Sequence, residues 1–167
     1  MLQGQSNSPE SFSVVEVWNM SIPDQLTSIH GRLNRLRYIV ISILFVFATF
    51  CYILVSAIII GIIVAILDLP WLLFDLGIGA LMIPVLYCSY AITIKRLQDM
   101  NWGGGWTTYL KGYIILAAVA GFVPTSSSLF EILNTVTLIL AIPLIVTLFA
   151  AGESGPNQFG PDPLSFQ

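Results

Sequence analysis

The stretch KRLQDMNWGGGWTTYLK, residues 95–111, is polar and lies between long apolar runs. It contains three of the six Lys and Arg residues of the chain, two tryptophans and a run of three glycines. Basic residues gather in the inner loops of membrane proteins, on the cytoplasmic side. The stretch therefore predicts a polar inner loop that joins two membrane hairpins.

The composition indicates an integral membrane protein. Of the 167 residues, 56% are hydrophobic and 9% are charged, whereas soluble domains carry about 25% charged residues. We expect the lipid bilayer as the surroundings of the chain, and no nucleic-acid partner. Residues 1–30 show no basic segment followed by an apolar one, so we expect no cleavable signal peptide.

Few residues of the chain suit catalysis or metal binding. Cys51 and Cys88 lie inside apolar runs, and His30, the only histidine, lies outside them. These residues are too few for a metal site, and one histidine cannot form a bis-histidine haem site. The sequence shows neither a nucleophile–base pair nor a phosphate loop between a strand and a helix. We therefore expect no enzyme activity, no metal and no cofactor.

The apolar runs predict an all-α fold, in which residues 31–151 form a bundle of four transmembrane helices. The first run is uncharged for 30 residues, or about 45 Å of helix, while the hydrocarbon core is about 30 Å thick. That helix therefore either protrudes from the bilayer or breaks near Gly61. The expected spans are residues 38–67, 76–94, 107–123 and 129–151.

Lys111 interrupts the third expected span. Counted from Val123, it lies roughly 12 Å inside the inner boundary if the span has full length. An ionisable residue at that depth is a functional candidate. Alternatively, the helix starts late and the lysine side chain extends to the headgroups. A re-entrant hairpin over residues 107–123 is a further alternative, and it would place the C-terminus outside.

Both terminal segments are polar. Residues 1–11 have the composition of a disordered segment, and residues 12–22 fit either a segment on the bilayer surface or a short strand. Pro23 is expected to break the chain, and a short interfacial helix is expected to begin at Asp24. Residues 152–167 form a Gly/Pro-rich tail, which excludes a regular helix or a central strand.

Charges separate by side in the four-span arrangement. Asp68 and Asp75, at the two ends of a short turn over Asp68–Asp75, fall on one side together with Glu131, and every basic residue falls on the other side. This is the positive-inside pattern, so we expect both termini in the cytoplasm. The basic residues are Arg32, Arg35, Arg37, Lys95, Arg96 and Lys111.

Small residues in the first span predict a packing face. Ala57, Gly61 and Ala65 recur at every fourth position, a spacing that lets a second helix approach closely. We expect this face to contact the second or fourth span, within the chain or across a dimer.

A polar cluster is expected on the cytoplasmic side. Arg32 and Arg35 are three residues apart, so they are expected to share a helix face. Asp99 lies in the inner loop, and we expect it to pair with Arg32, Arg35 or Arg96, because arginine offers a planar and always charged partner. The alternative is that these are independent solvated charges, each worth less than about 1 kcal/mol.

The tail is expected to complete this cluster. In this hypothesis the segment from Asn157 to Pro163 packs over the cluster, and Asp162 adds a second carboxylate. Phe159 would be the apolar plug, and the prolines would lower the entropy lost when the tail becomes ordered.

Three stretches together resemble a known family. They are GRLNRLRY (31–38), KRLQDMN (95–101) followed by Gly105-Trp106, and GPNQFGPDP (155–163). They are similar to the GRxxRxxY, RRLHDxxxSGW and GxNRFGPDP patterns of the YhaH-like small bacterial inner-membrane proteins, which share domain of unknown function 805. The resemblance covers roughly residues 29–163, and it implies a multi-span inner-membrane protein without implying an activity.

This sequence departs from the family patterns at several positions. Gln98 stands where the family usually has histidine, and Gln158 stands where it usually has arginine. Residues 102–105 replace a shorter segment. A proton or metal role of the family's histidine would therefore be missing here.

Three classes of function remain to be compared with these features. A structural or regulatory protein would bind a partner protein, anionic lipid or a second copy of itself through its cytoplasmic face, where each basic residue contributes about 1 kcal/mol near an acidic leaflet. A subunit of an oligomeric transporter or channel is the alternative, although such proteins usually place ionisable residues inside the bilayer. An enzyme ranks last. We rank the first class highest because it assumes the fewest features beyond those that the sequence shows.

Overall fold

The computed structural model describes residues 22–160, 162 and 163. The expectations for residues 1–11 and for residues 12–21 lie outside this range. Within the described residues the fold is all-helical, as expected. Its helices are α2 (Ile22–Thr27), α3 (Arg35–Ile66), α4 (Trp71–Asp99), α5 (Gly105–Gly121) and α6 (Ser128–Phe149).

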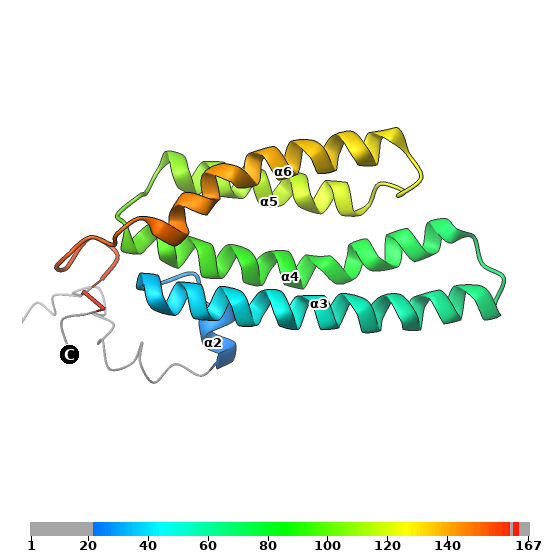
Figure 1. Cartoon of the computed structure of the whole chain (residues 1–167), viewed down its shortest axis with the longest axis horizontal. Coiled ribbons are helices and arrows are strands. Elements are labelled where there is room, and N and C mark those ends of the chain that lie inside the picture. Colours follow the sequence, from blue (N-terminus) through cyan, green and yellow to red (C-terminus); the bar gives the residue numbers. More distant parts are fainter. Residues whose placement is uncertain (1–21, 161, 164–167) are drawn as a thin grey trace, which may run out of the picture.

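The long helices form two neighbouring hairpins, with α4 between α3 and α5 (Figure 1). Each helix from α3 to α6 runs opposite to the one before it. The short helix α2, the α4–α5 connection and the tail therefore lie at one end of the molecule (Figure 1). The α3–α4 and α5–α6 turns lie at the other end.

Three of the described helices, α3, α4 and α6, are long and apolar enough to cross a membrane. In the most apolar window of each, 6% of the residues are buried inside the molecule. A protein in water would hide such helices from solvent, so these surfaces suit lipid. The helix α5 has 17 residues, or about 25 Å.

Buried side chains gather at the end that carries α2 and the tail. One apolar cluster is formed by Ile94, Leu97, Met100 and Leu110, between α4 and α5. A second contains Leu33, Tyr38 and Ile92, and it packs against Leu26 of α2 and Leu148 of α6. This end is therefore packed like the core of a globular domain.

The stretch at residues 95–111 is mainly helical, which differs from the expected loop. The helix α4 continues to Asp99, and α5 begins at Gly105, after Gly104 at φ 60°. Helix α4 does not end where its apolar run ends, because its last polar side chains have partners inside the protein. Because the expected end of this helix rests on hydropathy alone, it falls at residue 94, about one turn before the observed end at Asp99.

Pro23 and Pro70 lie at the starts of helices and do not interrupt them. Pro23 lies in the first turn of α2, and Pro70 is the residue before α4, so the expected turn at Asp68–Asp75 is shorter than predicted. Proline is tolerated at these positions because the first amide groups of a helix have no intrahelical partner. Asp75 thus lies inside α4, and its carboxylate accepts hydrogen bonds from the amide and hydroxyl of Thr125 at 3.4 and 3.1 Å.

The helix α3 is continuous over 32 residues and does not break near Gly61. At 1.5 Å per residue it is about 48 Å long, which exceeds the roughly 30 Å of a hydrocarbon core. It begins at Arg35, where the side chain of Asn34 caps it by accepting from the amide of Arg37 at 2.9 Å. Arg32 precedes the helix, so Arg32 and Arg35 do not share a helix face as expected.

At Gly61 the predicted packing face contacts α4, but a closer approach of two helix backbones lies between α4 and α5. Gly61 faces the ring of Phe74, which would be 3.7 Å from an added Cβ, and Ala65 is exposed while Ala57 is half-buried. A Cβ on Gly79 would instead overlap the carbonyl group of Gly121. Small residues thus bring the backbones of α4 and α5 together, a pair that the spacing within α3 could not reveal.

Candidate functional site

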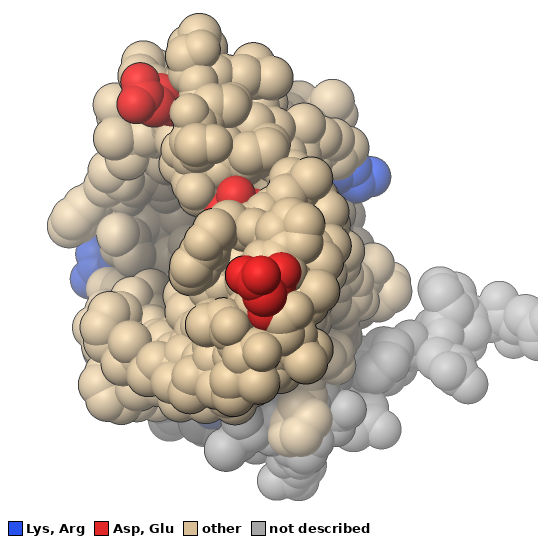
Figure 2. All heavy atoms as spheres, turned by 90° about the vertical axis from the view of Figure 1, so that its right-hand side faces the viewer, with Lys and Arg blue, Asp and Glu red and all other residues tan. Residues whose placement is uncertain are grey.

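The basic residues lie at or near the end that carries the tail, in α3, α4, the first turns of α5 and the loop before α3. Figure 2 looks onto the opposite end, where acidic side chains are exposed and the visible Lys and Arg side chains lie at the margin. Asp68, Asp75 and Glu131 belong to this opposite end. We call the end with the six basic residues the basic end, although Asp24, Asp99, Glu153 and Asp162 also lie there, and we call the end with Asp68, Asp75 and Glu131 the acidic end. Apolar helix surfaces separate the two ends.

Asp99, in the last turn of α4, lies between two arginines. Its Oδ1 atom is 3.2 Å from Nε of Arg32, and its Oδ2 atom accepts from the guanidinium of Arg96. Arg32, Arg96 and Asp99 are 4%, 0% and 3% exposed. We call these three residues the Arg–Asp–Arg cluster. Charges buried to this degree are stable only when paired and hydrogen-bonded, so the cluster is an integral part of the fold.

Backbone carbonyl groups satisfy the remaining donors of Arg96. Its Nε atom donates to the carbonyl of Thr147 at 3.0 Å, and one terminal nitrogen donates to the carbonyl of Leu33 at 3.3 Å. The other terminal nitrogen donates to the carbonyl of Ala150. Arg96 therefore connects the end of α6 to the loop before α3, and the fixed fork of a guanidinium suits this geometry.

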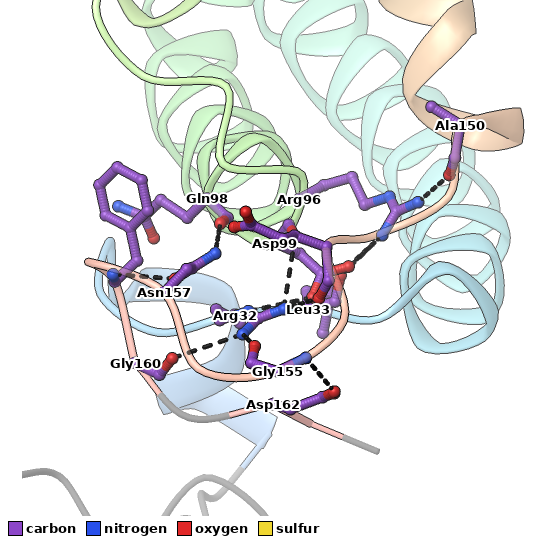
Figure 3. A network of polar contacts seen from close by, with 12 residues as sticks. Arg32, Leu33, Arg96, Gln98, Asp99, Ala150, Gly155, Asn157, Gly160 and Asp162 are labelled. Carbon is purple, nitrogen blue, oxygen red and sulfur yellow. Dashed lines mark hydrogen bonds and ion pairs between the residues drawn. The ribbon is translucent and has the colours of Figure 1, made fainter. Parts of the chain in front are cut away.

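Arg32 holds the tail in the same way. Its terminal nitrogens donate to the carbonyl groups of Gly155 at 2.6 Å and Glu153 at 2.5 Å. A longer contact of 3.4 Å reaches the carbonyl of Gly160 (Figure 3). One carboxylate thus faces two guanidinium groups, and carbonyl dipoles of the tail stabilise the excess positive charge.

The tail passes directly over Asp99. The amide of Glu153 donates to the Asp99 carbonyl at 2.8 Å. A Cβ on Gly152 would overlap the Asp99 carboxylate. Only glycine therefore lets the chain pass this close to the cluster.

Beyond Gly152 the tail folds into a tight loop. Asn157 and Gly160 pair through their backbones, and the Asn157 side chain donates to the Gln98 carbonyl at 3.0 Å (Figure 3). Asp162 accepts from the amide of Gly155 at 2.7 Å and so closes the loop, and its negative charge acts on Asp99, whose pKa is raised by burial and, to a smaller extent, by Asp162. Phe159 is half-buried, and its ring lies 3.5 Å from a Cβ built on Gly103, over the α4–α5 connection.

Other candidates lie outside the cluster. Arg35 is exposed in the first turn of α3, and the ion pairs of Asp99 in the described residues involve Arg32 and Arg96. Lys111 is exposed in the second turn of α5. Sequence reasoning placed Lys95 among the basic residues of the cytoplasmic side but did not predict its burial: it is 5% exposed and donates to the carbonyl of Gln25 in α2.

Within residues 22–160, 162 and 163, no group of three or more His, Cys, Asp or Glu side chains is arranged to hold a metal ion. A family model described as a protein of unknown function, DUF805, matches residues 26–161. The chain belongs to the DUF805 family. No curated protein and no solved structure matches it. The DUF805 match contains the whole Arg–Asp–Arg cluster and the tail as far as residue 161, so the cluster belongs to the common domain rather than to an addition.

Proposed function

We propose that this DUF805 protein crosses the bacterial inner membrane four times, with both termini in the cytoplasm. In this proposal it is a structural or regulatory protein whose basic end binds anionic lipid headgroups of the inner leaflet. The observation that carries the proposal is the separation of a basic end from an acidic end by exposed apolar helix surfaces. Basic residues near an acidic leaflet contribute about 1 kcal/mol each.

A fourth crossing by α5 is supported by its length and its flanks. Its 17 residues reach about 25 Å, and Lys111 near its start has a long side chain that extends to the headgroups. Trp102 and Trp106 stack with ring centroids 5.0 Å apart, and Tyr109 follows in edge contact at 5.9 Å. Such aromatic side chains favour the boundary between membrane and water.

The proposal is tested in nanodiscs of defined lipid. The purified protein is placed in phosphatidylcholine alone or in a mixture with phosphatidylglycerol, and its thermal unfolding is measured at low and high salt. We expect a higher Tm in the anionic mixture, with a difference that shrinks as salt screens the charges. Glu131→Gln, at the acidic end, serves as the control and should leave this difference unchanged. Equal Tm values for the natural protein in both lipids would refute lipid binding by the basic end.

A further inference from the structure

A small pocket lies at the basic end, between α2, the loop before α3, and the end of α4. It is lined by residues 30–33, Gln25, Arg37 and Lys95, and it is partly open to solvent. Among the described residues that line it, none is acidic, and His30, Arg32, Arg37 and Lys95 are basic. Arg32 is already engaged by Asp99 and the tail, and Arg37 also has an interaction partner.

Lys95 is the unusual residue of this pocket. Its side chain is 5% exposed, and the described partner of its ammonium group is one neutral oxygen, the carbonyl of Gln25. An ammonium group has three donors. The ion pairs among the described residues both belong to Asp99, so Lys95 has no carboxylate partner in this part of the chain. A buried charge is costly unless an opposite charge accompanies it.

The position of Lys95 suits the headgroup layer of a membrane. It lies in the last turns of α4, and α2 is attached beside it through further contacts with that helix. The hydroxyl of Tyr87 donates to the carbonyl of Thr27 at 2.9 Å, and the side chain of Gln98 donates to the carbonyl of Ile29 at 3.2 Å. These contacts hold α2 and the residues after it against α4 on one side of the pocket.

We propose that this pocket binds the phosphate group of an anionic phospholipid, with Lys95 as its buried cation and Arg37 and His30 at its rim. The proposal rests on the proposed function, because it requires the basic end to lie among headgroups. Phosphate supplies the missing negative charge and several acceptor oxygens, and Lys and Arg are its usual protein partners. Free inorganic phosphate carries the same chemistry, and the experiment separates the two sources.

The test compares Lys95→Met with Arg35→Gln, which removes an exposed charge at the same end. Each variant and the natural protein are purified in mild detergent from mixed phosphatidylcholine and phosphatidylglycerol. Native mass spectrometry then measures the phosphatidylglycerol that stays bound. We expect Lys95→Met to lower retention about tenfold, since a hydrogen bond to a charged group is lost. Arg35→Gln should retain nearly as much as the natural protein.

A second arm adds inorganic phosphate to protein in phosphatidylcholine nanodiscs and measures Tm at constant ionic strength. No shift is expected; a shift that depends on Lys95 would overturn the lipid as the ligand. If Lys95→Met does not fold, Arg37→Gln at the rim replaces it, and its retention should also fall.

The experiments distinguish a failure of the proposed function from a failure of the pocket assignment. Without any phosphatidylglycerol effect on the natural protein, the proposed function fails. If the natural protein responds to phosphatidylglycerol and the pocket variants respond equally, the pocket assignment is wrong and the lipid binds elsewhere on the basic end.

Discussion

The carboxylate of Asp99 is buried between two guanidinium groups of opposite charge. It is 3% exposed and receives both Arg32 and Arg96. Removing one member of such a group leaves buried charge without compensation, which costs more than the net value of the interaction itself. The three residues should therefore behave energetically as one unit.

Asp99→Asn should lower the free energy of unfolding by about 3–5 kcal/mol, because two buried guanidinium groups lose their counter-charge. Unfolding in detergent, followed by helical circular dichroism, measures the loss. Asp75→Asn, at the acidic end, is the matched control and should cost far less. In a double-mutant cycle, Asp99→Asn should couple strongly to Arg32→Gln and add simply to Arg35→Gln. Additivity with Arg32→Gln would show that their contact carries no energy.

Gly152→Ala should displace the tail from the cluster. The new methyl group would occupy the space of the Asp99 carboxylate, and such overpacking typically costs about 1–3 kcal/mol. Limited proteolysis should cut the tail of this variant faster than that of the natural protein. Gly112→Ala has open space around its Cβ and lies within α5, so it should be neutral or slightly stabilising. Equal proteolysis of the two variants would argue against a tight passage at Gly152.

At the scale of the helices, the contact between α4 and α5 depends on Gly79. Gly79→Ala would press a methyl group against the Gly121 carbonyl, so the two helices must separate. We expect a loss of about 1–3 kcal/mol in stability. Gly61→Ala is the informative comparison, because its methyl group finds ordinary contact with Phe74. A larger loss at Gly61 than at Gly79, measured as Tm in the same detergent, would mean that α3 supplies the closer helix contact.

Helix type was predictable from the sequence, and helix ends were less so. Long apolar runs identify α3, α4 and α6 because the bilayer selects for length and hydropathy together. The end of α4 was missed because Lys95, Arg96 and Asp99 are hydrophilic by composition and buried by arrangement. Their partners come from α2, the loop before α3, and the tail, and no local pattern reports such distant contacts.

The candidate site was predictable to a similar extent. Asp99, Arg32 and Arg96 were named from the chemistry of arginine and carboxylate, whereas Arg35 was included on the assumption that Arg32 already belongs to the helix. Asn34 starts the helix three residues later than that assumption requires. No feature of the sequence predicts the burial of Lys95, because a lysine beside an apolar run usually sets the orientation of a membrane helix from an exposed position.

For the whole molecule, the proposed topology places the tail and the α5–α6 turn on opposite sides of the membrane. In a background with Cys51 and Cys88 replaced by serine, Ser126→Cys should react with an impermeant thiol reagent in intact cells. Ser154→Cys should react only after the cells are permeabilised. Both residues are in exposed or loop positions, so access to solvent is comparable. Labelling of Ser154→Cys in intact cells would mean that α5 does not cross.

The hold of Arg32 on the tail has a consequence for biosynthesis. Its partner carbonyl at Glu153 is 121 residues further along the chain, and at about 5–20 residues per second translation needs roughly 6–24 s to produce it. During that interval Arg32 lacks its acceptors in the tail, because Glu153 and Gly155 have not yet been synthesised. A nascent chain that stops before residue 153 would leave the terminal nitrogens of Arg32 without their carbonyl acceptors in the tail. The contacts that bury Arg32 can thus be completed only after the C-terminal tail has been synthesised.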